Sequence, residues 1–244
     1  MGHEALRDAR LGTSVSQPSS SAPVAPPPGL TAPDPAPLGL IAFSLANIIQ
    51  SFFNAGVNPA LFPAAFPLEF LVGGLVQMIA GIFEFRQGSR LGATAFTVLG
   101  AFWLCFVIYA KYIVVTLPVE QAHTGTGLFL LPWAVVLLVL TLAAARTTAV
   151  LLAAFVSTTV TVSVLTAGEF VQSNALIRVG GGFGFLTAAL GLYGAFAGLV
   201  NGTWGRHLIP TYPDPGKRLE RLARDKPRPT SVTSSAAEHP EPSS

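Results

Sequence analysis

Neutral polar side chains inside long apolar runs are the residues of this sequence best suited to chemistry. The first two runs contain the amides Asn47, Gln50, Asn54 and Gln77. Each amide can donate two hydrogen bonds to a carboxylate, and it does so without the desolvation cost of a fixed positive charge. This pattern favours contact with a small anionic solute. Hydrogen bonds between neighbouring helices are an equally good interpretation of each amide.

Ionisable side chains within the apolar runs are few, and Glu84 is the main one. An ionisable group at membrane depth is costly and is a functional hypothesis by default, so Glu84 is a candidate proton site. An ion pair at the membrane interface with Arg86 or Arg90 is the favoured interpretation, because both arginines follow closely. Glu69 lies near the start of the same run and is expected to reach water.

Catalytic and metal chemistry have no support in the sequence. No metalloprotease, P-loop or dinucleotide-binding motif is present. The single cysteine, Cys105, rules out an intrachain disulfide and a multi-cysteine metal site. The histidines fall in predicted tails or loops: His3, His123, His207 and His239. We therefore predict a protein that is not an enzyme and that needs no cofactor or metal.

Composition indicates that most of the surface meets lipid rather than water. Of the 244 residues, 51% are hydrophobic and 11% are charged, and the mean hydropathy is +0.57. A soluble domain carries about 25% charged residues because its surface needs them. The formal net charge of +2 is too small to suggest nucleic acid binding. The predicted fold class is therefore an all-α integral membrane protein.

The apolar residues divide into runs long enough to cross a bilayer, which takes about 20 residues in a helix. Six spans are predicted, at residues 38–56, 67–85, 91–110, 127–145, 147–168 and 180–202. A soluble helical bundle is rejected as an alternative, because six consecutive helices would have almost no charged face to solvate.

Polar tails flank the membrane domain, which is predicted at residues 34–210. Residues 1–33 are rich in Pro, Ser and Ala and are predicted to be disordered, and residues 211–244 form a polar tail that is first basic and then rich in Pro and Ser. Lys and Arg concentrate on the side of these tails, and the opposite side holds only Lys111 and Arg178. The positive-inside rule therefore predicts a plasma-membrane protein with both termini in the cytoplasm.

Small and aromatic residues suggest how the spans pack. The sixth span contains the motif Gly180-x-x-x-Gly184, a spacing that lets helices approach closely. Whether such glycines join helices of one subunit or of two subunits is open at this point. Trp103, Trp133 and Trp204 are expected to anchor span ends at the membrane interface.

Four sequence blocks, taken in order, resemble a known family. Residues 34–40, Asp-Pro-Ala-Pro-Leu-Gly-Leu, resemble the N-P-A-P-L-G-L signature of the acetate uptake transporter family, also called succinate–acetate permeases. Residues 73–85 are similar to the second helix of that family, residues 92–97 and 100–104 to its third helix, and residues 205–210 to its C-terminal exit. Each block alone is weak evidence for the family, but the occurrence of all four blocks in the family's order is specific to it.

The resemblance implies six transmembrane helices per subunit around a pore, with the subunits assembled as a hexameric ring. It also implies passage of acetate and related small monocarboxylates, with succinate as a further candidate, by channel-like conduction or proton symport. The expected partners are therefore a small carboxylate, protons, the lipid bilayer and further copies of the chain. Two alternatives stay open: a pore for another small solute, and a membrane sensor or scaffold that transports nothing.

The family narrows its pore with an aromatic residue from helix one, a tyrosine from helix three and a leucine from helix five. Phe43 matches the first position, and Leu99 stands at the tyrosine position. The helix-five position falls on Phe155 or on Thr158, depending on which end of the helix is aligned. Loss of the tyrosine hydroxyl predicts a drier constriction that gates by dewetting.

Solute contact is predicted for Gln77, for the amides Asn47, Gln50 and Asn54 of the first span, and for Thr97. The resemblance bears on the start of the first span, where it marks an opening motif of Asp34, Pro35, Pro37 and Gly39. The prolines are expected to give an extended approach and then a helix whose free N–H groups form an anion site. Asp34 stands where the family has asparagine, and its carboxylate should repel an anion there.

Overall fold

The structure is a computed structural model that describes residues 33–212, and within that range every regular element is helical. The predicted tails therefore lie almost entirely outside the described residues. In chain order, the long helices and the short helical segments between them are α1 Ala36–Asn54, η2 Pro59–Ala64, η3 Leu68–Val76, α2 Gln77–Arg86, α3 Arg90–Ile108, η4 Tyr109–Ile113, η5 Val114–Thr116, α4 Val119–Ala144, α5 Ala149–Phe170 and α6 Asn174–Trp204.

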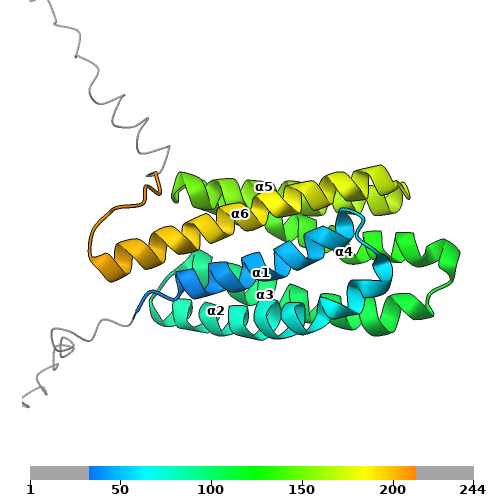
Figure 1. Ribbon diagram of the computed structural model, residues 1–244, viewed down its shortest axis with the longest axis horizontal. Coiled ribbons are helices and arrows are strands. Elements are labelled where there is room, and N and C mark those ends of the chain that lie inside the picture. Colours follow the sequence, from blue (N-terminus) through cyan, green and yellow to red (C-terminus); the bar gives the residue numbers. More distant parts are fainter. Residues whose placement is uncertain (1–32, 213–244) are drawn as a thin grey trace, which may run out of the picture. The chain divides into compact units, whose positions relative to one another are not determined.

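These elements form six candidate membrane spans, which confirms the predicted number. The second span joins a π-helical segment, η3, to α2, so it runs without a break from Leu68 to Arg86. The first span begins and the sixth ends at the same end of the bundle (Figure 1).

Two spans begin earlier than their hydrophobicity indicates. The fourth starts at Val119 directly after Pro118, and the sixth starts at Asn174 after Ser173, whose Oγ accepts a hydrogen bond from the N–H of Leu176 at 3.4 Å. A proline or a capping serine indicates where a helix begins even when the residues of its first turns are polar. The predicted starts at residues 127 and 180 are therefore too late.

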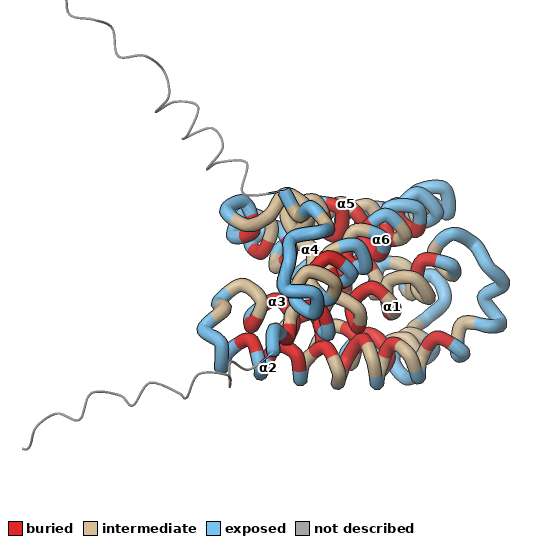
Figure 2. The backbone as a smooth tube through the Cα atoms, turned by 60° about the vertical axis from the view of Figure 1, so that its left-hand side comes forward, coloured by how far each residue is buried: buried red, intermediate tan, exposed pale blue. Residues whose placement is uncertain are grey.

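The first helix, α1, packs against α6 and against the second span. The last helix, α6, packs against α1 and α5, while α4 packs against α5, and the second span packs against α1 and α3. In Figure 1 α1 lies between the α5–α6 pair and the α2–α3 pair. Buried residues line the faces that these helices turn toward one another (Figure 2). Large apolar side chains such as Leu138, Val139 and Leu142 of α4 are exposed on the outside, as lipid contact requires.

Glycines of α6 allow its backbone to lie directly against α1 of the same chain. A Cβ built at Gly181 would lie 2.6 Å from the backbone nitrogen of Ala55, and one built at Gly184 would collide with the Ser51 hydroxyl. One at Gly191 would collide with the Ser44 hydroxyl. The open question about the sixth span is thereby answered for these positions, which join helices within one subunit.

Candidate functional site

Two cavities follow one another through the bundle. The larger, about 300 Å³, lies among α1, α3, α4 and α5 and extends toward the loop that follows α1. The smaller, about 180 Å³, lies toward the start of α1 and includes Ala36 and Ser89 in its wall. Among the described residues, three line both cavities: Phe43, Leu99 and Thr158.

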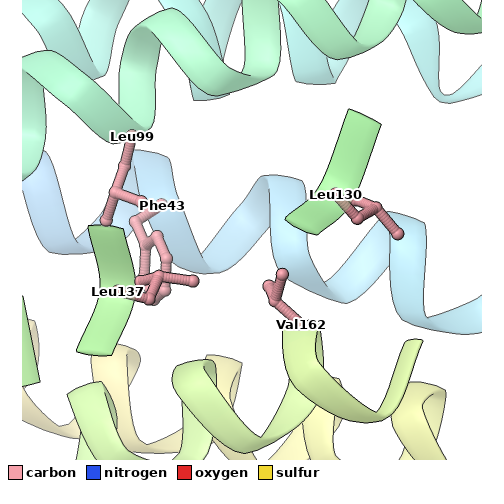
Figure 3. Close-up of a cluster of buried hydrophobic side chains, with 5 residues drawn as sticks. All are labelled: Phe43, Leu99, Leu130, Leu137 and Val162. Atoms are coloured by element: carbon pink, nitrogen blue, oxygen red, sulfur yellow. The ribbon is translucent and has the colours of Figure 1, made fainter. Parts of the chain in front are cut away.

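The shared wall is a narrow, apolar layer. Phe43 and Leu99 are each 7% exposed, and Leu137 of α4, which is 2% exposed, packs with them. Figure 3 shows these three side chains pointing toward one another from three different helices. The structure thus brings Phe43 and Leu99 together as the sequence predicts. Thr158 reaches both cavities, whereas Phe155 lines only the smaller one.

The amides of α1 line the larger cavity. Asn47, Gln50 and Asn54 recur at helical spacing and share one face of α1. Asn47 Nδ2 donates to the Phe43 carbonyl at 2.9 Å, and Gln50 Nε2 donates to Asn54 Oδ1 at 2.9 Å. Each of these two NH₂ groups keeps a second hydrogen, because an amide nitrogen carries two. Hydrogen-bond donors are therefore available to a solute.

Hydroxyl groups of α5 face the same cavity but present acceptors. Thr158 Oγ1 donates its hydrogen to the Ala154 carbonyl at 2.7 Å, and Thr161 Oγ1 donates to the Ser157 carbonyl at 2.8 Å. A hydroxyl has one hydrogen to donate, so each of these oxygens can then only accept. An undissociated acid can donate to such an oxygen, whereas a carboxylate cannot.

Two tryptophans line the larger cavity, and the sequence assigned them elsewhere. Trp103 is 3% exposed, Trp133 is partly buried, and both rings contact Phe102 at centroid distances of 5.1 and 5.2 Å. The expectation that they anchor span ends at the interface is therefore wrong, although Trp204 is exposed near the end of α6. Trp103 follows Leu99 by one helical turn, and this spacing was the available signal. An indole N–H is a further donor.

Gln77 and Thr97 lie behind the cavities rather than in their walls. Gln77 is fully buried, and neither its amide atoms nor Thr97 Oγ1 has a hydrogen-bond partner in the described part of the chain. A Cβ built at Gly81 would collide with the Thr97 hydroxyl, so Thr97 packs against the second span. Neither residue lines a cavity in the described part of the chain, and their contact with a solute stays a prediction.

The two acids of the second span differ from expectation. Glu69, expected to reach water, is fully buried, and both of its carboxyl oxygens lack a partner among the described residues. Glu84, expected to pair with an arginine, lies in the wall of the smaller cavity, where its carboxylate packs against Gly92. The Arg86 guanidinium lies over the Phe83 ring instead, 5.5 Å from its centroid. The interfacial ion pair is therefore wrong, and Glu84 stays a candidate proton site.

The opening motif builds the start of α1 rather than an anion site. Pro35 is αR and not extended, and Asp34 is exposed, with its Oδ1 accepting the Ala36 N–H at 2.9 Å. The N–H of Gly39 donates to the Pro35 carbonyl at 3.2 Å, and Pro37 has no N–H to offer. Of the first four helical positions, only one N–H is left for a ligand.

The far rim of the larger cavity carries a contact between two distant segments. Glu169, at the end of α5, lines the cavity, and its Oε2 lies 2.8 Å from Nδ1 of His123 in α4. Tyr109 and Thr126 share a hydrogen bond of 3.0 Å nearby in the same wall. Sequence reasoning placed His123 in a loop and missed Glu169, because nothing local links residues 46 positions apart.

A family model described as the GPR1/FUN34/yaaH family matches residues 17–213. That range includes all the described helices and both cavities. The chain belongs to this family. The predicted relationship to acetate uptake transporters is confirmed by the relatives that it resembles.

Two curated members of the GPR1/FUN34/yaaH family have informative names. Acetate permease A of Emericella nidulans is 31% identical over 209 residues, which cover 79% of this chain and 70% of the relative. The succinate-acetate/proton symporter SatP of Escherichia coli is 31% identical over 179 residues, covering 72% of this chain and 94% of the relative. These names describe solutes carried by the relatives.

A solved structure agrees with the family assignment. The structure of the bacterial acetate channel SatP matches with a TM-score of 0.69 and 30% sequence identity, covering 74% of this chain and 99% of that chain. The chain is therefore a multi-pass membrane protein with the fold of a channel.

Proposed function

We propose that this chain carries acetate and related small monocarboxylates across the membrane through its two cavities and the layer between them. The observation that carries the proposal is a route lined by amide N–H groups and closed by the layer of Phe43, Leu99 and Thr158. The names of acetate permease A and of SatP support the same solute class.

The lining chemistry suits a weak acid. Neither cavity has a lysine or arginine among its lining residues in the described part of the chain. A carboxylate can be held by the spare N–H groups of Asn47, Gln50 and Asn54, but crossing the apolar layer as a bare anion would cost several kcal/mol. Crossing with a proton removes that cost, and the acceptor oxygen of Thr158 can receive the acid O–H. Proton symport follows, with Glu84 as the candidate proton site on the far side of the layer.

Uptake of labelled acetate into proteoliposomes tests this function. We expect flux above that of protein-free vesicles, competition by propionate, and faster uptake when the outside is acidic. A proton uncoupler should abolish the acceleration by the pH gradient if protons are carried with the solute. Absence of flux above empty vesicles would leave only a sensor or scaffold role.

A small amine or ammonium is the second candidate solute. Glu169 is the only Asp, Glu, Lys or Arg among the lining residues of the larger cavity in the described chain, and a carboxylate attracts cations. The ammonia transport outward protein 2 of Saccharomyces cerevisiae is 33% identical over 183 residues, covering 72% of this chain and 65% of the relative. Flux of methylammonium that acetate does not inhibit would favour this candidate.

Assembly and location belong to the same proposal. The chain would assemble as a homo-hexamer, as the resemblance to acetate uptake transporters implies, and lie in the plasma membrane with its termini in the cytoplasm, as the distribution of Lys and Arg predicts. Native mass spectrometry would give the number of subunits. Protease access to the two tails in sealed cells would give their side of the membrane.

Leu99 gives a direct test of the constriction. Leu99→Tyr places a larger side chain in the layer shared by the cavities, so we expect the ratio of acetate to propionate uptake to rise roughly three- to tenfold, because the extra methylene of propionate must pass a narrower layer. Protein yield and particle size should not change. Ile108→Tyr, on the exposed face of the same helix, is the control, and an identical solute ratio in both variants would mean that Leu99 does not meet the solute.

A further inference from the structure

The contact between His123 and Glu169 lies where a solute enters or leaves the larger cavity. Nδ1 of His123 and Oε2 of Glu169 are 2.8 Å apart, and the side chains are 43% and 16% exposed. Glu169 lines the cavity together with Asn54 and Ile177, at the end opposite Phe43 and Leu99. The pair therefore joins the first turns of α4 to the last turn of α5 across the rim.

Few other charges act on this carboxylate. On α4 the other ionisable side chain is Glu120, which is exposed one turn before His123. On α6, Arg178 lies at the same end, but a Cβ built at Gly56 would be 3.1 Å from its Nε, so its guanidinium faces the loop after α1. The ammonium of Lys111 lies over the Tyr112 ring, 5.0 Å from its centroid.

The remaining ionisable groups on neighbouring elements do not face Glu169. Tyr193 of α6 donates a hydrogen bond to the Pro210 carbonyl, and Tyr109 bonds to Thr126. Among residues 33–212, His123 forms the one ion-pair contact of Glu169. His123 is thus the ionisable group in direct contact with Glu169, and protonation of its imidazole changes the net charge of this pair.

We infer that His123 and Glu169 form a charge filter that determines which solutes enter the larger cavity. The inference rests on the proposed transport function and names two specificity-determining residues for it. When the imidazole is protonated, the pair is neutral overall and a carboxylate can pass. When the imidazole is neutral, the carboxylate of Glu169 is uncompensated, so it repels anions and admits amines or ammonium.

The filter works by a change of charge and not by a change of shape. A nitrogen-to-oxygen distance of 2.8 Å is kept by an imidazolium and by a neutral imidazole that carries its hydrogen on Nδ1. Imidazole is the side chain whose charge changes between about pH 5 and 8. Admission of carboxylates should therefore rise as the pH falls, beyond the rise caused by protonation of the solute itself.

Acetate exchange in proteoliposomes with the same pH on both sides tests the filter. The variants are Glu169→Gln, His123→Gln and the double variant, with Glu120→Gln as the control that removes one acid from the same end of the bundle. Each rate is divided by the wild-type rate at the same pH, because this cancels the protonation of acetate. Methylammonium exchange is measured in parallel.

Relative to wild type, Glu169→Gln removes one negative charge at pH 5.5 and at pH 8 and should raise acetate exchange roughly three- to tenfold at both. The double variant should raise it by a similar factor at pH 8 and leave it nearly unchanged at pH 5.5, because the pair carries a net negative charge only when the imidazole is neutral. His123→Gln should lower acetate exchange by a similar factor at pH 5.5 and have little effect at pH 8. The rate of methylammonium exchange should change in the opposite direction in each variant. Glu120→Gln should alter the exchange rate of neither solute.

Ratios for His123→Gln and for the double variant that do not vary with pH would overturn the inference while leaving acetate transport intact. Wild-type exchange no faster than that of empty vesicles would instead overturn the proposed function. If one of these two variants fails to fold, the pH dependence expected of the other still decides the question.

Discussion

The Gly181→Ala variant is expected to lose most of its folded yield and to melt well below wild type in detergent. A Cβ at this position would lie 2.6 Å from the Ala55 backbone nitrogen and 2.9 Å from the Asn54 carbonyl carbon. Backbone atoms cannot rotate away as a flexible side chain can, so α6 and α1 must separate. Overpacking of this kind costs about 1–3 kcal/mol or more. Fluorescence-detected size-exclusion chromatography after heating measures the effect.

The neighbouring glycine provides the control for this variant. A Cβ at Gly182 would meet nothing within 4 Å of the chain, and alanine has the better helix propensity. Gly182→Ala should therefore match wild type or slightly exceed it. Equal melting of the two variants would mean that α6 does not contact α1 through Gly181 in the membrane.

The Phe43→Ala variant should admit bulky carboxylates that wild type excludes. Its ring forms part of the layer shared by both cavities, so its removal joins them into one continuous route. We expect pivalate uptake to rise at least about tenfold relative to acetate uptake, because the steric barrier at the layer is removed. The Phe43 ring faces both cavities, so its removal takes away fewer packing contacts than removal of a ring enclosed in a core. The loss in the free energy of unfolding should therefore lie below the roughly 3–5 kcal/mol typical of a core Phe→Ala change.

A second aromatic residue of α1 serves as the control for Phe43→Ala. Phe53 also lines the larger cavity, but it packs against Phe62 and lies away from the shared layer. Phe53→Ala should leave the ratio of pivalate to acetate unchanged. Pivalate exclusion by a well-folded Phe43→Ala protein would show that the narrow point lies elsewhere.

Helical spacing made part of the site predictable. Phe43, Asn47, Gln50 and Asn54 follow one another at intervals of three or four residues, so they must share one face of α1. Because Phe43 lies on the side of α1 that faces the pore, the three amides on the same face must also line the pore. The six spans were predictable for a similar reason, because long apolar runs have few alternatives in a membrane.

Contacts between distant segments were not predictable. The distance between His123 and Glu169 depends on how α4 and α5 pack. In addition, the polar residues that follow Pro118 give no hydrophobic pattern from which a helix at His123 could be predicted. Glu69 illustrates a second obstacle. It belongs to the π-helical segment η3, whose i→i+5 bonding changes which residues face inward. The α-helical period then gives the wrong face for the first turns of the second span.

The barrier between the two cavities is a single layer of side chains, and this affects how fast a solute can cross the protein. Transporters that rock whole domains around a central site are limited by motions of microseconds to milliseconds. In this chain two cavities already reach the layer from both sides, and what separates them is Phe43, Leu99 and Thr158. Rotation of one ring is a change of rotamer, which is faster by orders of magnitude than movement of a helix bundle. We therefore expect passage of a solute to require rotation of side chains in this layer and no movement of whole helices.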